Sequence, residues 1–147
     1  MNKSELEKLI QSFEKNEFLK DSDTTISYSD LKNIFKKDQQ LKQGIYKHPK
    51  LSDIHFFPLQ EKDPQVFILS LINLWTNDYV PLILDPSLKE EEIQFFLNSW
   101  SLSKTTPKKS SQDKELYFFI LTSGSTGIPK LVGHSLDNAL KSTQMLR

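Results

Sequence analysis

The central part of the chain alternates between segments patterned as strands and segments patterned as helices. Asp63-Pro64, a pair typical of a helix start, precedes Val66 to Trp75, which is apolar almost all round. Asn77-Asp78 marks a turn, and the apolar run Tyr79 to Leu84 has the length of a strand. The expected order is strand 53–59, helix 63–75, strand 79–84, helix 87–100 and strand 116–121. Alternating strands and helices favour an α/β fold, with helices packed on a mixed sheet.

The helix expected over residues 87–100 is clearly amphipathic. Ser87-Leu88-Lys89-Glu90 has the pattern of a capping box, and Glu90-Glu91-Glu92 gives the helix a solvated, acidic first turn. The apolar residues of its buried face are Ile93, Phe96, Leu97 and Trp100. Residues 101–115 contain one leucine and no aromatic residue, so a solvated loop is expected there.

Three more helices are expected nearer the ends of the chain. Ser4-Glu5-Leu6-Glu7 resembles a capping box, and apolar residues at helical spacing extend this first helix to about Phe18. Ser27 to Ile45 carries a second apolar stripe. Near the other end, Ser135 is expected to begin a helix with Leu136 on its apolar face.

Composition excludes several classes of function. The 147 residues form one domain or a piece of a larger one. Lysine plus arginine and aspartate plus glutamate both number 19, so no net charge attracts nucleic acid or an anionic membrane. The chain has no cysteine, which excludes disulfides and thiolate metal sites. Because it also shows no secretory signal and no apolar run near the ~20 residues that span a bilayer, a cytoplasmic protein without a membrane span is expected.

A hydroxyl-rich loop with two glycines follows the strand expected at 116–121. Gly124 and Gly127 permit positive φ, so successive backbone N–H groups can converge on an anion. Lys130 adds a compact positive charge suited to a terminal phosphate. Rotatable hydroxyl donors come from Thr122, Ser123, Ser125 and Thr126. Residues 131–134 are expected to return as an antiparallel strand, so an ordinary hairpin loop is the alternative interpretation.

The loop differs from the Walker phosphate loop, in which lysine directly follows the second glycine. Here Ile128 and Pro129 intervene. The full run Thr122-Ser123-Gly124-Ser125-Thr126-Gly127-Ile128-Pro129-Lys130 instead closely resembles the signature loop of the adenylate-forming superfamily. That superfamily includes acyl- and aryl-CoA synthetases, peptide-synthetase adenylation domains and beetle luciferases. Leu131 stands where many members carry glycine, so the match loosens after the lysine.

Weaker similarity to the same family extends upstream of the loop. Ile26-Ser27-Tyr28-Ser29-Asp30-Leu31 is similar to an early family segment, T-Y-x-E-L, that opens a helix. Residues 78–86, Asp-Tyr-Val-Pro-Leu-Ile-Leu-Asp-Pro, are similar to its G-A-x-x-V-P-L-D-P strand and turn, with Asp78 in place of the usual Gly-Ala. The resemblance therefore spans about Ser27 to the end of the chain.

The resemblance implies that residues 1–147 are an incomplete N-terminal part of the large domain of an ATP-dependent carboxylic acid–thiol ligase, similar to an acyl-CoA synthetase. Such enzymes use ATP with Mg²⁺ to form an acyl-adenylate, and coenzyme A or a carrier pantetheine then accepts the acyl group. The family's loop holds the β- and γ-phosphates. Carried over, the binding residues are Thr122, Ser123, Gly124, Ser125, Thr126, Gly127 and Lys130, and Lys130 is also the expected catalytic group, through phosphate stabilisation.

Other interpretations stay open at this point. The family's remaining motifs lie after the loop, so the 147-residue chain alone is not expected to be catalytically complete. One alternative is a non-catalytic truncated product that binds polyphosphate or a protein partner, and another is a separate nucleotide-binding domain that hydrolyses ATP. His134 lacks an identifiable catalytic partner and is expected to be structural. His48 and His55 show no metal-binding spacing, so no metal site is predicted.

Overall fold

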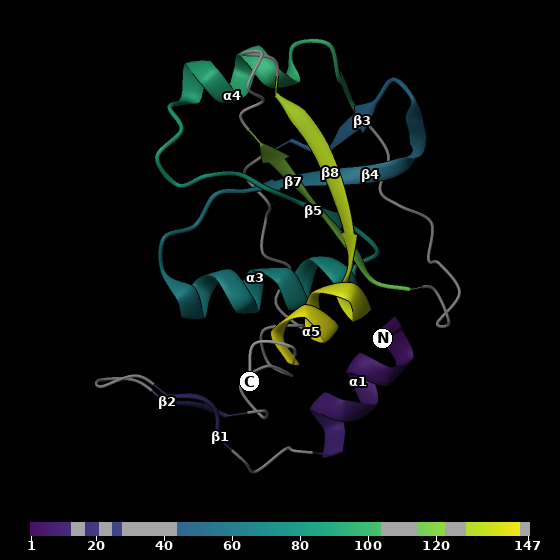
Figure 1. Ribbon diagram of the computed structural model, residues 1–147, viewed down its shortest axis with the longest axis vertical. Coiled ribbons are helices and arrows are strands. Elements are labelled where there is room, and N and C mark those ends of the chain that lie inside the picture. The colour runs from purple at the N-terminus through teal and green to yellow at the C-terminus, as the bar shows by residue number, and fades with distance from the viewer. Residues whose placement is uncertain (13–16, 21–24, 28–43, 104–114, 123–128, 145–147) are drawn as a thin grey trace.

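The computed structural model describes the chain except for residues 13–16, 21–24, 28–43, 104–114, 123–128 and 145–147, drawn as grey traces in Figure 1. The first part contains α1 (Lys3–Ser12), β1 (Glu17–Lys20), β2 (Thr25–Ser27), β3 (Tyr46–His48) and β4 (Leu51–Leu59). The middle contains α3 (Pro64–Thr76), β5 (Val80–Ile83), α4 (Glu90–Leu97) and β6 (Ser101–Leu102). The last part contains β7 (Tyr117–Thr122), β8 (Lys130–Ser135) and α5 (Leu136–Gln144).

A six-stranded mixed sheet is the centre of the fold. Its strand order is β6-β3-β4-β5-β7-β8, and a separate antiparallel pair is formed by β1 and β2. The three central strands, β4, β5 and β7, are parallel, whereas β3, β6 and β8 pair antiparallel with their neighbours. Leu59, Ile83 and Thr122 are the last residues of the parallel strands. They lie along the side of the sheet where these strands end, its carboxyl-terminal edge. The predicted α/β class with a mixed sheet and flanking helices is confirmed.

Helices cover both faces of the sheet, and alternation along the strands assigns each side chain to a face (Figure 1). Phe56 of β4, Leu82 of β5 and Phe119 of β7 pack with Ile93 and Leu97 of α4. The neighbouring residues of β4, Phe57 and Leu59, pack against Leu74 of α3 on the opposite face. Beyond α3, the apolar side of α1 packs against Trp75 and Leu116. The strands 53–59, 79–84 and 116–121 and the helix after Asp63 are thus confirmed, with small shifts of their ends.

The start of α3 follows the predicted chemistry. Asp63 caps the helix, because its carboxylate accepts hydrogen bonds from the backbone N–H groups of Gln65 (2.8 Å) and Val66 (3.0 Å). Pro64 stands at the first helical position, where a missing N–H costs nothing. At the other end, Asp78 adopts φ 65° and reverses the chain into β5, which confirms the turn expected at Asn77-Asp78.

Two predicted helix starts are wrong in position. Helix α1 is capped by Asn2, whose side chain accepts from Glu5 N (2.9 Å) while the Glu5 carboxylate accepts from Asn2 N (2.8 Å). At α4 the cap is Lys89, whose backbone N–H donates to the Glu92 carboxylate (2.8 Å). Each true start lies two residues from the predicted one. At α1 both Asn2 and Ser4 are capping residues with glutamate three positions later, whereas at α4 the Lys89 side chain makes no cap hydrogen bond and only the Glu92 contact is formed.

Three predicted segments end differently. Helix α1 stops at Ser12, and Glu17–Lys20 is the strand β1 instead of a continuation to Phe18, because it pairs with β2. Ser27 ends β2 rather than beginning a helix, and residues 28–43 of the helix expected over 27–45 lie outside the described residues. Trp100 lies beyond α4, and Ser101–Leu102 of the expected loop pair with β3; residues 104–114 lie outside the described residues.

Gly133 of β8 lies against the ring of Phe119. A Cβ atom added at Gly133 would lie 2.7 Å from Phe119 Cε1, and this ring is itself held edge-to-face against Phe56 at 5.1 Å. We expect Gly133→Ala to lower the free energy of unfolding by about 1–3 kcal/mol, the usual cost of overpacking. Urea unfolding would measure this, with Val132→Ala on the same strand as a control. Phe119→Leu, which replaces the ring by a smaller side chain, should reduce the effect of Gly133→Ala. Equal effects of Gly133→Ala with Phe119 and with Leu at this position would contradict the steric explanation.

Candidate functional site

The strands β7 and β8 form an antiparallel hairpin, and residues 123–129 connect them. The register pairs Tyr117 with Ser135 at one end and Thr122 with Lys130 at the other. The Thr122 hydroxyl donates a hydrogen bond to the Lys130 carbonyl oxygen (3.3 Å). The predicted antiparallel return of the chain after the loop is therefore confirmed, and the two outer residues of the predicted site are brought face to face.

The structure places two of the seven predicted binding residues. Both Thr122 and Lys130 are exposed, so the hydroxyl and the ammonium group are open to solvent. The five between them, Ser123, Gly124, Ser125, Thr126 and Gly127, lie outside the described residues. The structure therefore shows where Thr122 and Lys130, the two outer residues of the predicted site, lie in the sheet.

The hairpin opens at the carboxyl-terminal edge of the parallel strands. Thr122 ends β7, which runs parallel to β5 and thus in the same direction as β4. In open α/β sheets, ligands bind in the crevice beyond the carboxyl ends of the strands. The segment that follows Thr122 thus begins where this type of sheet usually presents its binding groups.

The loop end of the hairpin packs on the apolar core beneath α4. Leu121 and Leu131, which precede Thr122 and follow Lys130, pack in the same cluster as Leu84, Ile93 and Leu97. Burial of these side chains stabilises the pairing of the strands next to the loop. The two strand ends that flank the loop therefore rest on the packed core, and such support helps to position a binding group.

A turn after β5 lies at the same edge of the sheet. The Asp85 carboxylate accepts hydrogen bonds from Ser87 N (2.8 Å) and Ser87 Oγ (2.7 Å), which hold the pKa of Asp85 below its usual value. The Gln60 side-chain nitrogen donates to the carbonyl oxygens of Asp85 (3.0 Å) and Leu88 (2.7 Å). These bonds link the residue after β4 to the turn after β5. The sequence gives no signal for them, because the acceptors are backbone oxygens about 25 residues away from Gln60.

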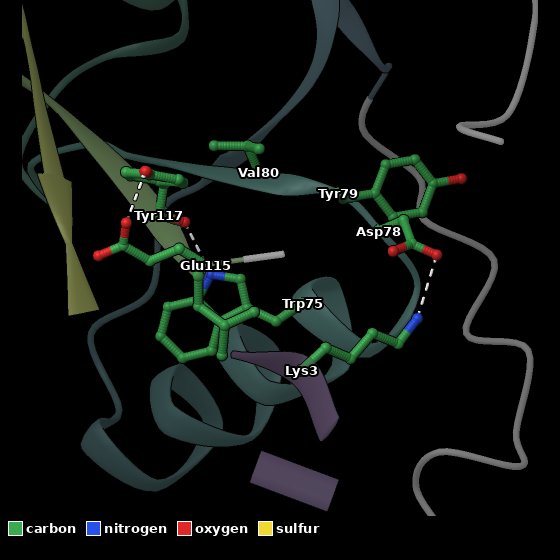
Figure 2. A pocket seen from close by; sticks show the side chains of 8 residues that line it. Lys3, Trp75, Asp78, Tyr79, Val80, Glu115 and Tyr117 are labelled. Atoms are coloured by element: carbon green, nitrogen blue, oxygen red, sulfur yellow. Dashed lines mark hydrogen bonds and ion pairs between the residues drawn. The ribbon is translucent and has the colours of Figure 1, made fainter. Parts of the chain in front are cut away.

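A polar cluster braces the other end of β7, and Figure 2 shows it around a small cavity of about 30 Å³. Trp75 Nε1 donates to the carbonyl oxygen of Tyr117 (2.8 Å). The Tyr117 hydroxyl donates to the Glu115 carboxylate (2.7 Å), and this bond raises the pKa of Tyr117. Lys3 of α1 forms an ion pair with Asp78 (3.1 Å). The Trp75 hydrogen bond fastens α3 to the hairpin, and the Lys3–Asp78 ion pair fastens α1 to the turn after α3. The cavity itself has room for little more than one water molecule.

Two of the three histidines, His48 and His134, take part in aromatic contacts. His134 of β8 is half-buried and stacks on Phe118 at 5.4 Å, which agrees with its expected structural role. His48 makes an edge contact with Trp100 at 4.9 Å. Trp75 and Trp100 both pack in core clusters, as predicted. Within the described ranges, no group of three or more histidines and carboxylates could hold a metal ion.

No protein-family model matches the chain, and no curated protein matches it either. In the part of the chain that the structure describes, no helix has the length and apolar character needed to cross a membrane. The proposal that follows is therefore supported by the residues of the hairpin and their place in the sheet.

Proposed function

We propose that the chain is the N-terminal portion of an ATP-dependent carboxylic acid–thiol ligase, and that residues 122–130 bind the β- and γ-phosphates of ATP. The observation that carries the proposal is the pairing of Thr122 with Lys130 at the carboxyl-terminal edge of the parallel strands. This pairing holds a hydroxyl and an ammonium group on either side of a segment whose sequence resembles the family's phosphate loop.

The chemistry of acid activation accounts for these residue types. A substrate carboxylate oxygen attacks the α-phosphorus of ATP, a bond forms between them, and the bond to the bridging oxygen breaks as pyrophosphate leaves. Negative charge builds on the leaving pyrophosphate, so groups that hydrogen-bond its oxygens lower the barrier. In this proposal the Lys130 ammonium neutralises part of that charge, and the N–H groups of the loop donate hydrogen bonds. The Thr122 hydroxyl donates as well, after it exchanges its bond to the Lys130 carbonyl oxygen for one to the phosphate. Mg²⁺ would enter with the phosphates of ATP and supply further charge neutralisation. The thiol of coenzyme A or of a carrier pantetheine would then take the acyl group, with release of AMP.

Binding to the 147-residue chain tests the phosphate site directly. In ¹⁵N-labelled protein, tripolyphosphate and ATP–Mg²⁺ are expected to shift the amide signals of Thr122 and Lys130, whereas AMP, which lacks the β- and γ-phosphates, leaves them unchanged. Shifts confined to another part of the chain, or equal shifts with AMP, would contradict the assignment.

The catalytic half of the proposal needs a second measurement. A protein that contains this chain together with the residues encoded after Arg147 is expected to exchange pyrophosphate into ATP in the presence of its carboxylic acid. Phosphate binding at Thr122 and Lys130 without exchange, across fatty, aromatic and amino acids, would instead favour the non-catalytic binding module. Turnover of ATP by the 147-residue chain alone would favour a separate ATP-hydrolysing domain.

A further inference from the structure

A second cavity, of about 360 Å³, lies on the α4 face of the sheet. Leu84, Ile93 and Leu97 form an apolar wall and are nearly inaccessible to solvent. Pro58 and Gln60, at the carboxyl end of β4, bring the cavity to the same edge of the sheet as the hairpin. Its volume lies within the roughly 300–1,000 Å³ typical of small-molecule sites, and its place fits the usual ligand crevice of α/β sheets.

The polar groups around this cavity are rich in hydrogen-bond acceptors. Both hydrogens of the Gln60 side-chain amide are used, because its nitrogen donates to two backbone carbonyls that can only accept. The Gln94 amide nitrogen uses one of its two hydrogens, which it donates to the Glu90 carboxylate (2.7 Å). Most of what remains accepts hydrogen bonds: the carbonyl oxygens of Gln60 and Gln94 and the second carboxylate oxygen of Glu90. One Gln94 N–H and the Tyr46 hydroxyl can still donate.

Among the described residues that line the cavity, Glu90 carries the only formal charge at neutral pH. An anion would meet the Glu90 carboxylate, whereas an ammonium group would find this carboxylate and amide oxygens beside an apolar wall. The described lining therefore favours a cation over an anion.

From this arrangement we infer that the cavity binds a small organic amine, with its ammonium group at Glu90, Gln60 and Gln94 and its apolar body against Leu84, Ile93 and Leu97. This site is separate from the proposed triphosphate site, and its occupancy does not depend on the ligase proposal. Leu121 and Leu131, which flank the hairpin loop, share a core cluster with the apolar wall.

Three probes with one apolar body and different head groups test the inference on the full 147-residue chain. Phenethylamine is expected to shift the amide signals of α4 in a ¹⁵N-NMR titration and to bind about tenfold more tightly than phenylacetate, with 2-phenylethanol in between. The inference fails if millimolar phenethylamine shifts no α4 signal, or if phenylacetate binds as tightly as the amine.

Two pairs of adjacent substitutions separate this site from nonspecific binding. Glu90→Gln is expected to weaken phenethylamine binding about three- to tenfold and leave 2-phenylethanol unchanged, whereas Glu91→Gln, in the same exposed helical turn, changes neither. Gln94→Trp is expected to fill the cavity and abolish binding of both probes, whereas Phe95→Trp, outside the cavity, leaves it intact. Equal effects within either pair would overturn the inference, and ATP titration of the same variants shows whether the hairpin still functions.

Discussion

Replacement of Lys130 by alanine is expected to weaken tripolyphosphate binding to the 147-residue chain by about 10- to 100-fold. The reason is the loss of a charge-assisted hydrogen bond, which contributes about 1.5–3 kcal/mol. Because Lys130 is exposed, its truncation should leave the fold intact. Calorimetric titration at fixed ionic strength measures the change, and pyrophosphate exchange by the proposed full-length ligase should fall with it.

Two further lysine variants make this result specific. Lys141→Ala removes an exposed lysine from the last turn of α5, away from the hairpin, and should change binding little. Lys130→Arg keeps the charge at the start of β8 and should retain most of the affinity. If Lys141→Ala weakens binding as much as Lys130→Ala, the effect comes from net charge and the phosphate assignment is wrong.

Phe56→Ala is expected to lower the free energy of unfolding by about 3–5 kcal/mol, a large part of the stability of a domain of this size. Phe56 is fully inaccessible to solvent and contacts the rings of Trp100 and Phe119 edge-to-face, each at 5.1 Å. Its removal leaves a cavity between the sheet and α4, since neighbouring side chains relax only partially. Urea unfolding followed by tryptophan fluorescence measures the loss.

An exposed phenylalanine provides the matched control for this core position. Phe95 lies on α4 with 67% of its surface exposed, so Phe95→Ala should change stability by less than about 0.5 kcal/mol. Phe56→Leu, which keeps most of the volume, should retain a cooperative transition if Phe56→Ala proves too unstable to fold. Similar losses in Phe95→Ala and Phe56→Ala would mean that the sheet–α4 interface is not the stabilising core described here.

The sequence predicted the elements that have a strong local pattern. The strand over β4, the Asp63-capped α3 and the β7–β8 hairpin combine continuous apolar runs with clear boundary residues. By contrast, β6 has two residues and β3 has three, so neither carries a periodic pattern. Their partners fix such short strands: β4, which follows directly, pairs with β3, and β3 pairs with the distant β6. The residues of β3 and β6 alone carry too little pattern to predict either pairing.

The candidate site also has a part that the sequence predicts and a part that it does not. The antiparallel return after the loop was predicted, because a hairpin links residues close in sequence. The expected strands, 116–121 and 131–134, left Thr122 and Lys130 in the loop, whereas the structure extends both strands by one residue and pairs these two. The cavity beneath α4 could not be predicted, since β3, β4 and α4 bring Tyr46, Gln60 and Gln94 together from separate parts of the chain. Its acceptor-rich character depends on how two glutamine amides are oriented, which only their partners determine.

The attachment of α1 to late segments of the chain has a consequence for synthesis on the ribosome. Leu6 and Ile10 pack against Trp75 of α3 and against Leu116, and Asn2 bridges to Glu115, so the cover of this helix is completed only after more than a hundred further residues have emerged. At translation rates of about 5–20 residues per second, its apolar side waits on the order of 5–20 s before that cover is complete. During that interval the nascent chain presents a surface suited to capture by a chaperone.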